Sequence, residues 1–191
     1  MPKNQKKENE TLEKNLKKKI VQLSALYEVG KSITSTLYLE EVLELITRKA
    51  AKIMDGSSCT LRLLDRAKKQ LVLKCAHGLS RKRYKTKKVL KLGESIEGRV
   101  IKSGKPYIAR QKGPRSFITA PLIQRNRAIG VLSIYSKKVR RYSEEDAMLL
   151  SMFASQAAIA IENARLYEQA EVSYINTIRT LSNIIDAKDS H

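Results

Sequence analysis

Two glycine-containing segments invite comparison with loops that bind phosphate groups. Gly93–Gly98 has glycines at the outer positions of a dinucleotide-binding fingerprint, but Ser95 replaces the middle glycine that lets the backbone approach a pyrophosphate. Gly104-Lys105 matches part of a phosphate-binding loop, but Pro106 stands where a Ser or Thr would bind magnesium. Neither segment therefore predicts a nucleotide site.

Residues that commonly act as nucleophiles, bases or metal ligands are few. His77 and His191 have no nucleophile or metal partner nearby in the sequence, and no pair of carboxylates stands out. Cys59 and Cys75 lie in apolar, strand-like runs, which favours buried reduced thiols over a disulfide or a metal site. The sequence thus predicts no catalytic residue, metal site or cofactor, and we do not expect this chain alone to be an enzyme.

The net charge of +19 would suit a nucleic acid, an anionic membrane surface or an anionic ligand. However, two of the three basic blocks flank turns, where solvated charge is expected, and no helix-turn-helix signature accompanies them. We therefore favour a solvated basic surface and regard nucleic-acid binding as the less favoured alternative. The three blocks are Lys3, Lys6, Lys7, Lys14, Lys17, Lys18 and Lys19; Arg81–Lys91; and Lys137, Lys138, Arg140 and Arg141.

The composition indicates a folded protein, because 42% of the residues are hydrophobic. The N-terminus is polar and lysine-rich, without the apolar core of a signal peptide. No run approaches the roughly 20 apolar residues of a membrane span. We therefore expect a cytoplasmic protein with no membrane segment in this chain.

Apolar periodicity predicts an α+β domain in which helices at both chain ends cover one face of an antiparallel sheet. Helices are expected over Leu12–Gly30 and Tyr38–Met54, and a short third helix is expected to be capped by Ser95 and ended by Gly104. Short polar links between the strands predict hairpins. The strands are expected at Cys59–Asp65, Gln70–His77, Val89–Leu92, Pro106–Ala109, Phe117–Gln124 and Ala128–Tyr135.

A long terminal helix is predicted to begin after Ser143, which is followed by three acidic residues that complement the helix dipole. A series of mostly apolar residues recurs in steps of three and four from Leu150 to Ile185, and only Glu171 in this series is charged. A stripe of this length exceeds what one compact domain would bury, so we expect it to pair with a second copy. The proposed dimer residues are Leu150, Phe153, Ala157, Ala160, Ala164, Tyr167, Tyr174 and Ile178.

An ordered series of short segments runs through the chain, namely Leu26–Gly30, Leu39–Leu43, Leu61–Asp65, Ala76–Leu79, Gly93–Pro106, Ala120–Ile123, Ile129–Leu132 and Tyr142–Asp146. In order and spacing, over roughly residues 26–168, this series resembles the GAF domain family. The resemblance implies a six-stranded antiparallel sheet backed by helices, a pocket on the other face of the sheet, and signalling through dimeric helices.

Two departures from the family pattern limit what the resemblance implies about a ligand. Ser136-Lys137, Tyr142 and Glu145-Asp146 replace the signature of cyclic-nucleotide-binding members, so cyclic AMP or GMP binding is not expected. The connection from Ala109 to Ser116 is shorter than the helical loop that roofs the ligand in many members, so we expect a shallow, open or absent pocket. Candidate lining residues for an unidentified small molecule, with simple packing as the alternative, are Cys75, Ile96, Val100, Ile118 and Ala120.

The C-terminal segment Thr177–Asp189 resembles the first helix of an HD-GYP domain, a family of metal-dependent phosphodiesterases that hydrolyse cyclic diguanylate. We therefore divide the chain into a basic N-terminal helix or tail (1–25), a GAF domain (26–168), and a signalling helix that begins a truncated output domain (169–191). The expected function is a sensory module of a bacterial signal-transduction protein. The alternatives are a ligand-free dimerisation module and a nucleic-acid-binding regulator.

Overall fold

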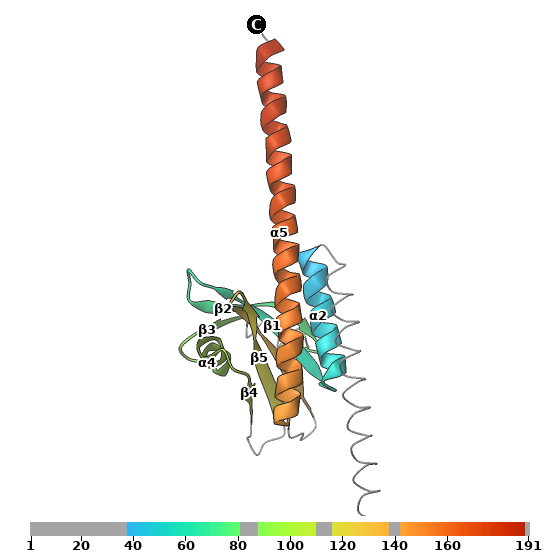
Figure 1. The fold of residues 1–191 in the computed structure, drawn as a ribbon, viewed down its shortest axis with the longest axis vertical. Helices are drawn as coiled ribbons and strands as arrows, with labels where there is room; N and C mark the ends of the chain where they lie inside the picture. The colour runs from blue at the N-terminus through green and yellow to red at the C-terminus, as the bar shows by residue number, and fades with distance from the viewer. Residues whose placement is uncertain (1–37, 81–87, 110–115, 138–141, 190–191) are drawn as a thin grey trace, which may run out of the picture.

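The computed structural model describes residues 38–80, 88–109, 116–137 and 142–189. Within this part, a single sheet has a helical layer on one face and a short helix on the other, and one long helix extends beyond the domain (Figure 1). The helix predicted over Leu12–Gly30 lies outside the described residues.

The sheet has six strands in the order β3-β2-β1-β6-β5-β4, and every neighbouring pair is antiparallel. This arrangement confirms the predicted α+β fold. The strands are β1 (Ser58–Asp65), β2 (Gln70–His77), β3 (Val89–Lys91), β4 (Tyr107–Ile108), β5 (Ser116–Gln124) and β6 (Arg127–Ser136).

The hairpin between β5 and β6 turns through two residues with left-handed backbone, Arg125 (φ 46°) and Asn126 (φ 59°). Two positive φ values in a two-residue loop match the twist of the flanking strands. Pro121 lies within β5, where it cannot donate a hydrogen bond, but β4 pairs only with Ile118 and Thr119. The edge of β5 beyond Thr119 therefore accommodates a proline.

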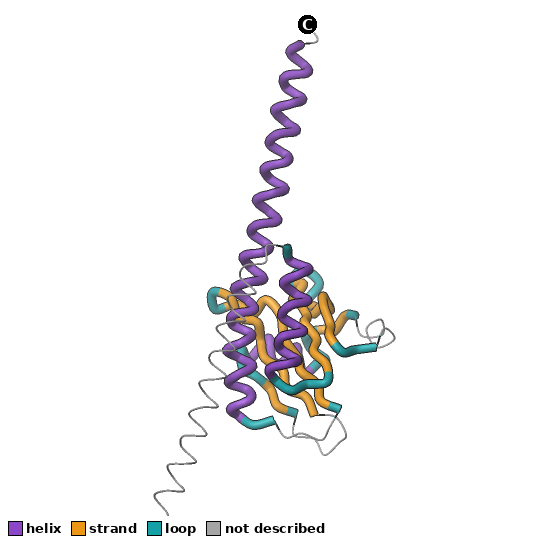
Figure 2. Tube along the Cα trace, turned by 90° about the vertical axis from the view of Figure 1, so that its right-hand side faces the viewer, coloured by secondary structure: helices purple, strands orange, loops and turns teal. Residues whose placement is uncertain are grey.

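Helices α2 (Leu39–Ile53) and α5 (Glu144–Asp189) lie side by side on one face of the sheet, as predicted (Figures 1 and 2). The core lies between these two helices and alternate residues of the strands, because successive strand residues point to opposite faces. Its largest fully buried side chains include Ile46, Leu61, Ile118, Leu122, Leu132, Ile134, Leu150, Phe153 and Ile161.

Helix α4 (Ile96–Ser103) begins and ends at the predicted residues. The Gly98 amide donates a hydrogen bond to Ser95 Oγ at 3.0 Å, and Gly104 ends the helix in a left-handed conformation. Helix α5 begins with a reciprocal cap, in which the Asp146 amide donates to Ser143 Oγ and the Ser143 amide donates to Asp146 Oδ2.

The N-terminal half of α5 belongs to the core of the protomer, which corrects the predicted dimer stripe. The exposed fraction is at most 2% for each of the five predicted dimer residues in this half. The prediction failed because α5 lies along β5 and beside α2, so the protomer itself covers this side of the helix. The corrected residues are Leu150, Phe153, Ala157, Ala160 and Ala164.

The C-terminal half of the same helix leaves the domain as a rod (Figure 1), and none of its residues from 165 to 182 is buried. Tyr167, Tyr174 and Ile178 are exposed here by 41%, 68% and 45%, so their assignment to a dimer interface stays a prediction. By length and composition, Glu144–Ser182 could cross a membrane, with a mean hydropathy of 1.2 over its most apolar 18 residues. However, 56% of that window is buried in the domain, as in the core helix of a folded protein.

Candidate functional site

The sheet face toward α4 carries a layer of buried polar side chains. On β1, Thr60 and Arg62 alternate with core residues that face α2 and α5, so they point to the opposite face. Thr60 pairs in register with Ser133 on β6, which pairs in turn with Thr119 on β5. The Ser133 hydroxyl donates a 2.8 Å hydrogen bond to Thr119 Oγ1, and the exposed fraction of all four residues is 4% or less.

Arg62 is the only buried charged residue among those that the structure describes. Its Nη1 donates a long 3.5 Å hydrogen bond to the Lys88 carbonyl oxygen, and its Nε has no hydrogen-bond partner. Burial lowers the pKa of the guanidinium, while the nearby Tyr135 and Glu97 oppose this change. An arginine keeps its proton even so, because its ordinary pKa is far above neutral pH. The site therefore contains a buried positive charge.

Half-buried aromatic residues border this polar layer. The ring of Phe117 stacks on Tyr135 at 5.8 Å between centroids and lies 6.0 Å from Tyr107. The Tyr135 hydroxyl donates a 3.5 Å hydrogen bond to Glu97 Oε1 on α4, and burial, followed by the charge of Glu97, raises the pKa of this phenol. The guanidinium of Arg99 lies 5.9 Å from the centre of the Tyr107 ring. The rim thus combines stacking surfaces with hydrogen-bonding groups.

The five predicted pocket residues do not converge on this site, which corrects the prediction. Val100 packs with Leu71 and Val131 on the α4 side of the sheet. Cys75, Ile118 and Ala120 lie on the opposite face, in the core beneath α2 and α5. The fifth candidate, Ile96, is half-buried in the first turn of α4. Alternation along a strand predicted that Ile118 and Ala120 share a face, but it could not predict which layer covers that face.

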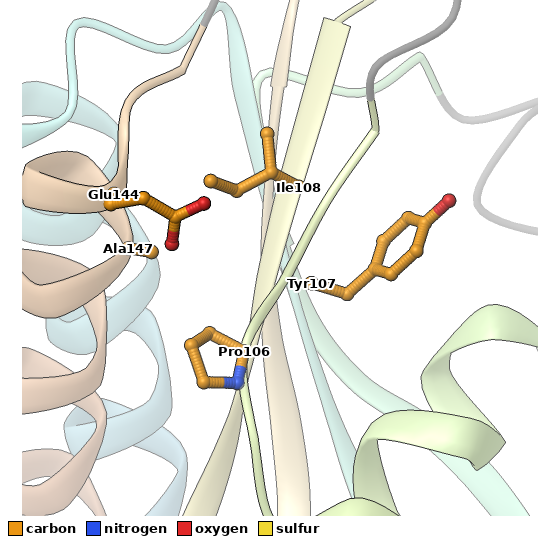
Figure 3. A pocket seen from close by; sticks show the side chains of 5 residues that line it. All are labelled: Pro106, Tyr107, Ile108, Glu144 and Ala147. Atoms are coloured by element: carbon orange, nitrogen blue, oxygen red, sulfur yellow. The ribbon is translucent and has the colours of Figure 1, made fainter.

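A separate pocket of about 330 Å³ lies at the sheet edge, between β4 and the start of α5 (Figure 3). Pro106, Ile108 and Ala147 line it, and the carboxylate of Glu144 points into it, whereas the ring of Tyr107 points toward the other side of the strand. Among its lining residues, Glu144 is the one that carries a charge. The sequence did not predict this pocket.

Comparison with known proteins decides the family. A family model described as the GAF domain matches residues 36–162. The chain belongs to the GAF domain family.

The relatives of this GAF domain include parts of much longer proteins. The chain is 27% identical over 159 residues to the "Phosphoenolpyruvate-dependent phosphotransferase system" protein of Escherichia coli (strain K12), covering 75% of this chain and 21% of that protein. It therefore spans about a fifth of the length of the curated relatives that it matches.

Two solved structures show the same fold. The GAF domain from a phosphoenolpyruvate-protein phosphotransferase of Coxiella burnetii has a TM-score of 0.67 at 23% identity, covering 78% of this chain and 96% of that one. The GAF domain/HD domain protein from Geobacter sulfurreducens has a TM-score of 0.60 at 12% identity, covering 70% and 98%. Identities this low establish the fold alone.

The titratable residues singled out in the sequence do not assemble into a reactive centre in the described part of the GAF domain. Cys59 is buried, and Cys75 Sγ lies 3.4 Å from Thr47 Oγ1. Burial raises the pKa of both thiols, so they are poor nucleophiles at neutral pH. His77 is exposed at the end of β2. Among the described residues, no group of three potential ligands could hold a metal ion.

Sequence reasoning missed Thr60 and Arg62, although a signal for them was present. Along Cys59–Leu63, polar and apolar residues alternate, which is typical of a strand with one face in the core and one in water. The structure instead covers the polar face with α4. From the alternation alone, Arg62 would be assigned to a face exposed to solvent.

Proposed function

We propose that this GAF domain is a sensory module that relays its state through α5 to an output domain. The observation that supports this proposal is the continuity of one helix. Phe153, Ala157 and Ile161 of α5 are fully enclosed in the core, and the same helix runs on to Asp189. A shift of the sheet against its helical layer would therefore move the rod, because close-packed interfaces tend to switch between discrete arrangements.

We further propose that two copies pair through the rod. Tyr167, Tyr174 and Leu181 recur every seven residues and are exposed by 41%, 68% and 56%. Ile178, exposed by 45%, lies four residues after Tyr174, so these side chains share one helical face. An apolar face of this kind is stabilised when a partner helix covers it. Pairing of two rods would fix the relative position of whatever follows them.

Sedimentation of the full chain and of a chain ending after Ala170 tests the rod as the interface. Of the α5 residues whose burial the structure describes, the shorter chain keeps every buried one, and it also keeps Glu168, whose side chain accepts a hydrogen bond from α2. We expect the full chain to be a dimer and the shorter chain a folded monomer. A cut after Phe153 would be uninformative, because it would remove Ala157 and Ile161 from the core.

A point variant separates the interface from the length of the rod. Ile178→Asp should convert the dimer into a monomer, because it places a charge on the proposed apolar face. Thr177→Asp is the matched control on a neighbouring face, where the Thr177 hydroxyl only bonds back to the Ser173 carbonyl. Dimers that persist in Ile178→Asp would contradict pairing through this face.

We propose an HD-GYP phosphodiesterase as the output domain. Two observations support it, namely the resemblance of Thr177–Asp189 to the first HD-GYP helix and the shared fold with a GAF domain/HD domain protein. The curated relatives favour a second candidate, phosphotransfer from phosphoenolpyruvate. Assays of the complete gene product for cyclic diguanylate hydrolysis and for phosphorylation by phosphoenolpyruvate distinguish the two. Hydrolysis without phosphorylation is the expected result.

A further inference from the structure

The charge balance around Arg62 is unusual for a protein interior. Its exposed fraction is 4%, and no ion pair joins it to any carboxylate among the described residues. A buried charge without a partner is costly, so buried arginines are normally paired. The charge of Glu97 acts on the guanidinium, but this carboxylate accepts a hydrogen bond from the Tyr135 hydroxyl and is not bonded to Arg62.

The three segments between residues 80 and 142 that the structure does not describe cannot provide the missing negative charge. The segments 81–87, 110–115 and 138–141 contain eleven lysines and arginines in total, and none contains an aspartate or a glutamate. The segment that contacts Arg62 is basic as well, since the carbonyl oxygen that accepts the hydrogen bond from Arg62 belongs to Lys88. Among the residues that the structure describes, Glu97 is therefore the one carboxylate whose charge bears on Arg62, and an anion from outside this part of the chain can complete the charge balance.

We propose that Arg62 binds the anionic group of a small molecule in the polar layer between the sheet and α4. Two oxygens held in one plane, as in a carboxylate or on one face of a phosphate, match the fork of a guanidinium. The Nε of Arg62 has no hydrogen-bond partner and is free for such a contact. The hydroxyl of Thr60 lies on the same sheet face and has no hydrogen-bond partner. It supplies a further donor toward the anion.

The residues at the rim of the polar layer determine how a ligand enters and which ligand is favoured. Glu97, Tyr107, Phe117 and Tyr135 are all half-buried, so the polar layer reaches solvent between α4 and the strands. The aromatic rings offer flat surfaces for the body of the ligand, and the Glu97 carboxylate favours a ligand that also carries a hydrogen-bond donor. Helix α4 would move as the ligand enters, because Val100 packs on the same face of the sheet. This inference rests on the proposed sensory role and specifies its ligand.

Thermal unfolding of the full chain tests the inference, with inorganic phosphate and succinate as separate probes and succinamide as the uncharged control. Ionic strength is held constant with potassium chloride. We expect at least one anionic probe to raise Tm by about 3–6 °C at about ten times its Kd, and succinamide to have no effect. The response to phosphate or to succinate identifies which anionic group the site prefers. No response to either probe would overturn the inference.

Two variants locate the anion. Arg62→Met should abolish the rise in Tm, whereas Arg48→Met, which removes an exposed charge from α2, should retain it. An equal rise in Arg62→Met would overturn the assignment to this residue. The oligomeric state of the full chain is measured separately by sedimentation, so a failure of the dimer proposal does not affect this result.

The variant Glu97→Gln decides whether an external anion or Glu97 itself neutralises Arg62. It also keeps the inference testable if Arg62→Met does not fold. The amide still accepts the hydrogen bond from Tyr135 but no longer repels an anion. We expect a larger rise in Tm with the anionic probe than in the wild type. A lower Tm without probe, together with no larger response, would show that Glu97 is the counter-ion of Arg62.

Discussion

The amide of Leu39 donates a 3.1 Å hydrogen bond to Glu168 Oε1, across 129 positions of the sequence. Leu39 is the first residue of α2, whose N-cap residue, Tyr38, makes no side-chain cap of its own. Glu168 lies on α5 just beyond Ala164, the last residue of this helix that the structure shows to be buried. The first turn of a helix has unsatisfied amides and a positive dipole end, so a carboxylate from α5 caps α2. This contact ties the rod to the domain.

The first prediction concerns this cap. Glu168→Ala should lower the free energy of unfolding by about 1 kcal/mol, the usual effect of removing a helix cap. It should also loosen the edge contact between Tyr38 and Tyr167, whose ring centroids are 6.5 Å apart. Urea denaturation measures the first effect. Glu171→Ala, which removes an exposed carboxylate one turn further along the rod, is the control and should be neutral.

The second prediction concerns the contact that holds α4 close to the chain before it. A Cβ atom on Gly98 would collide with the backbone carbonyl oxygen of Leu92. Gly98→Ala should therefore displace the start of α4 and destabilise the domain by about 1–3 kcal/mol. Gly93→Ala is the matched control, since a Cβ there would meet no atom within 4 Å. Equal stability of the two variants would show that α4 tolerates displacement.

Local chemistry made the elements of this fold predictable from the sequence. Ser95 and Gly104 delimit α4 because each supplies a capping interaction that other residue types provide poorly. The Ser143–Asp146 cap likewise marks the start of α5. These signals depend on residues close together in the chain, so they are visible without the tertiary structure.

The layer that covers each face depends on distant contacts and was not predictable. The stripe from Leu150 to Ala164 has the same spacing whether a second copy or the domain's own sheet covers it. Arg62 stands in a strand that alternates as if one face met water, but α4, more than thirty residues later, covers that face. The candidate site was missed because its burial comes from packing between distant segments.

The third prediction concerns the buried hydrogen bond between Ser133 and Thr119. Ser133→Ala should cost about 1–3 kcal/mol, because it leaves the Thr119 hydroxyl buried without this partner. The double variant Ser133→Ala/Thr119→Val should cost less than the sum of the single changes, since both polar groups are then removed together. A double-mutant cycle measured by urea denaturation checks this coupling. Additive costs would mean that the two hydroxyls do not interact energetically.

The fourth prediction concerns the reactivity of the two thiols. Burial raises the pKa of Cys75 and raises that of Cys59 well above the ordinary value. Because the thiolate is the reactive form, alkylation of the folded chain by iodoacetamide should be slow at neutral pH and should accelerate only above the usual thiol pKa. Half-buried Cys75 should react before Cys59, which is fully enclosed. Mass spectrometry of the labelled peptides distinguishes them.

The same pKa shifts fix the sign of a pH effect on stability. A thiol whose pKa is raised by folding binds its proton more tightly in the native state. The contribution of this thiol to the stability of the fold is therefore fully present below the ordinary thiol pKa and is lost as the pH rises above it.

The variant Thr47→Val tests the cause of the shift at Cys75, because the contact of Thr47 Oγ1 with Cys75 Sγ lowers the pKa of that thiol. The variant should raise this pKa further and slow the alkylation of Cys75, whereas faster labelling would mean that Thr47 shields the sulfur.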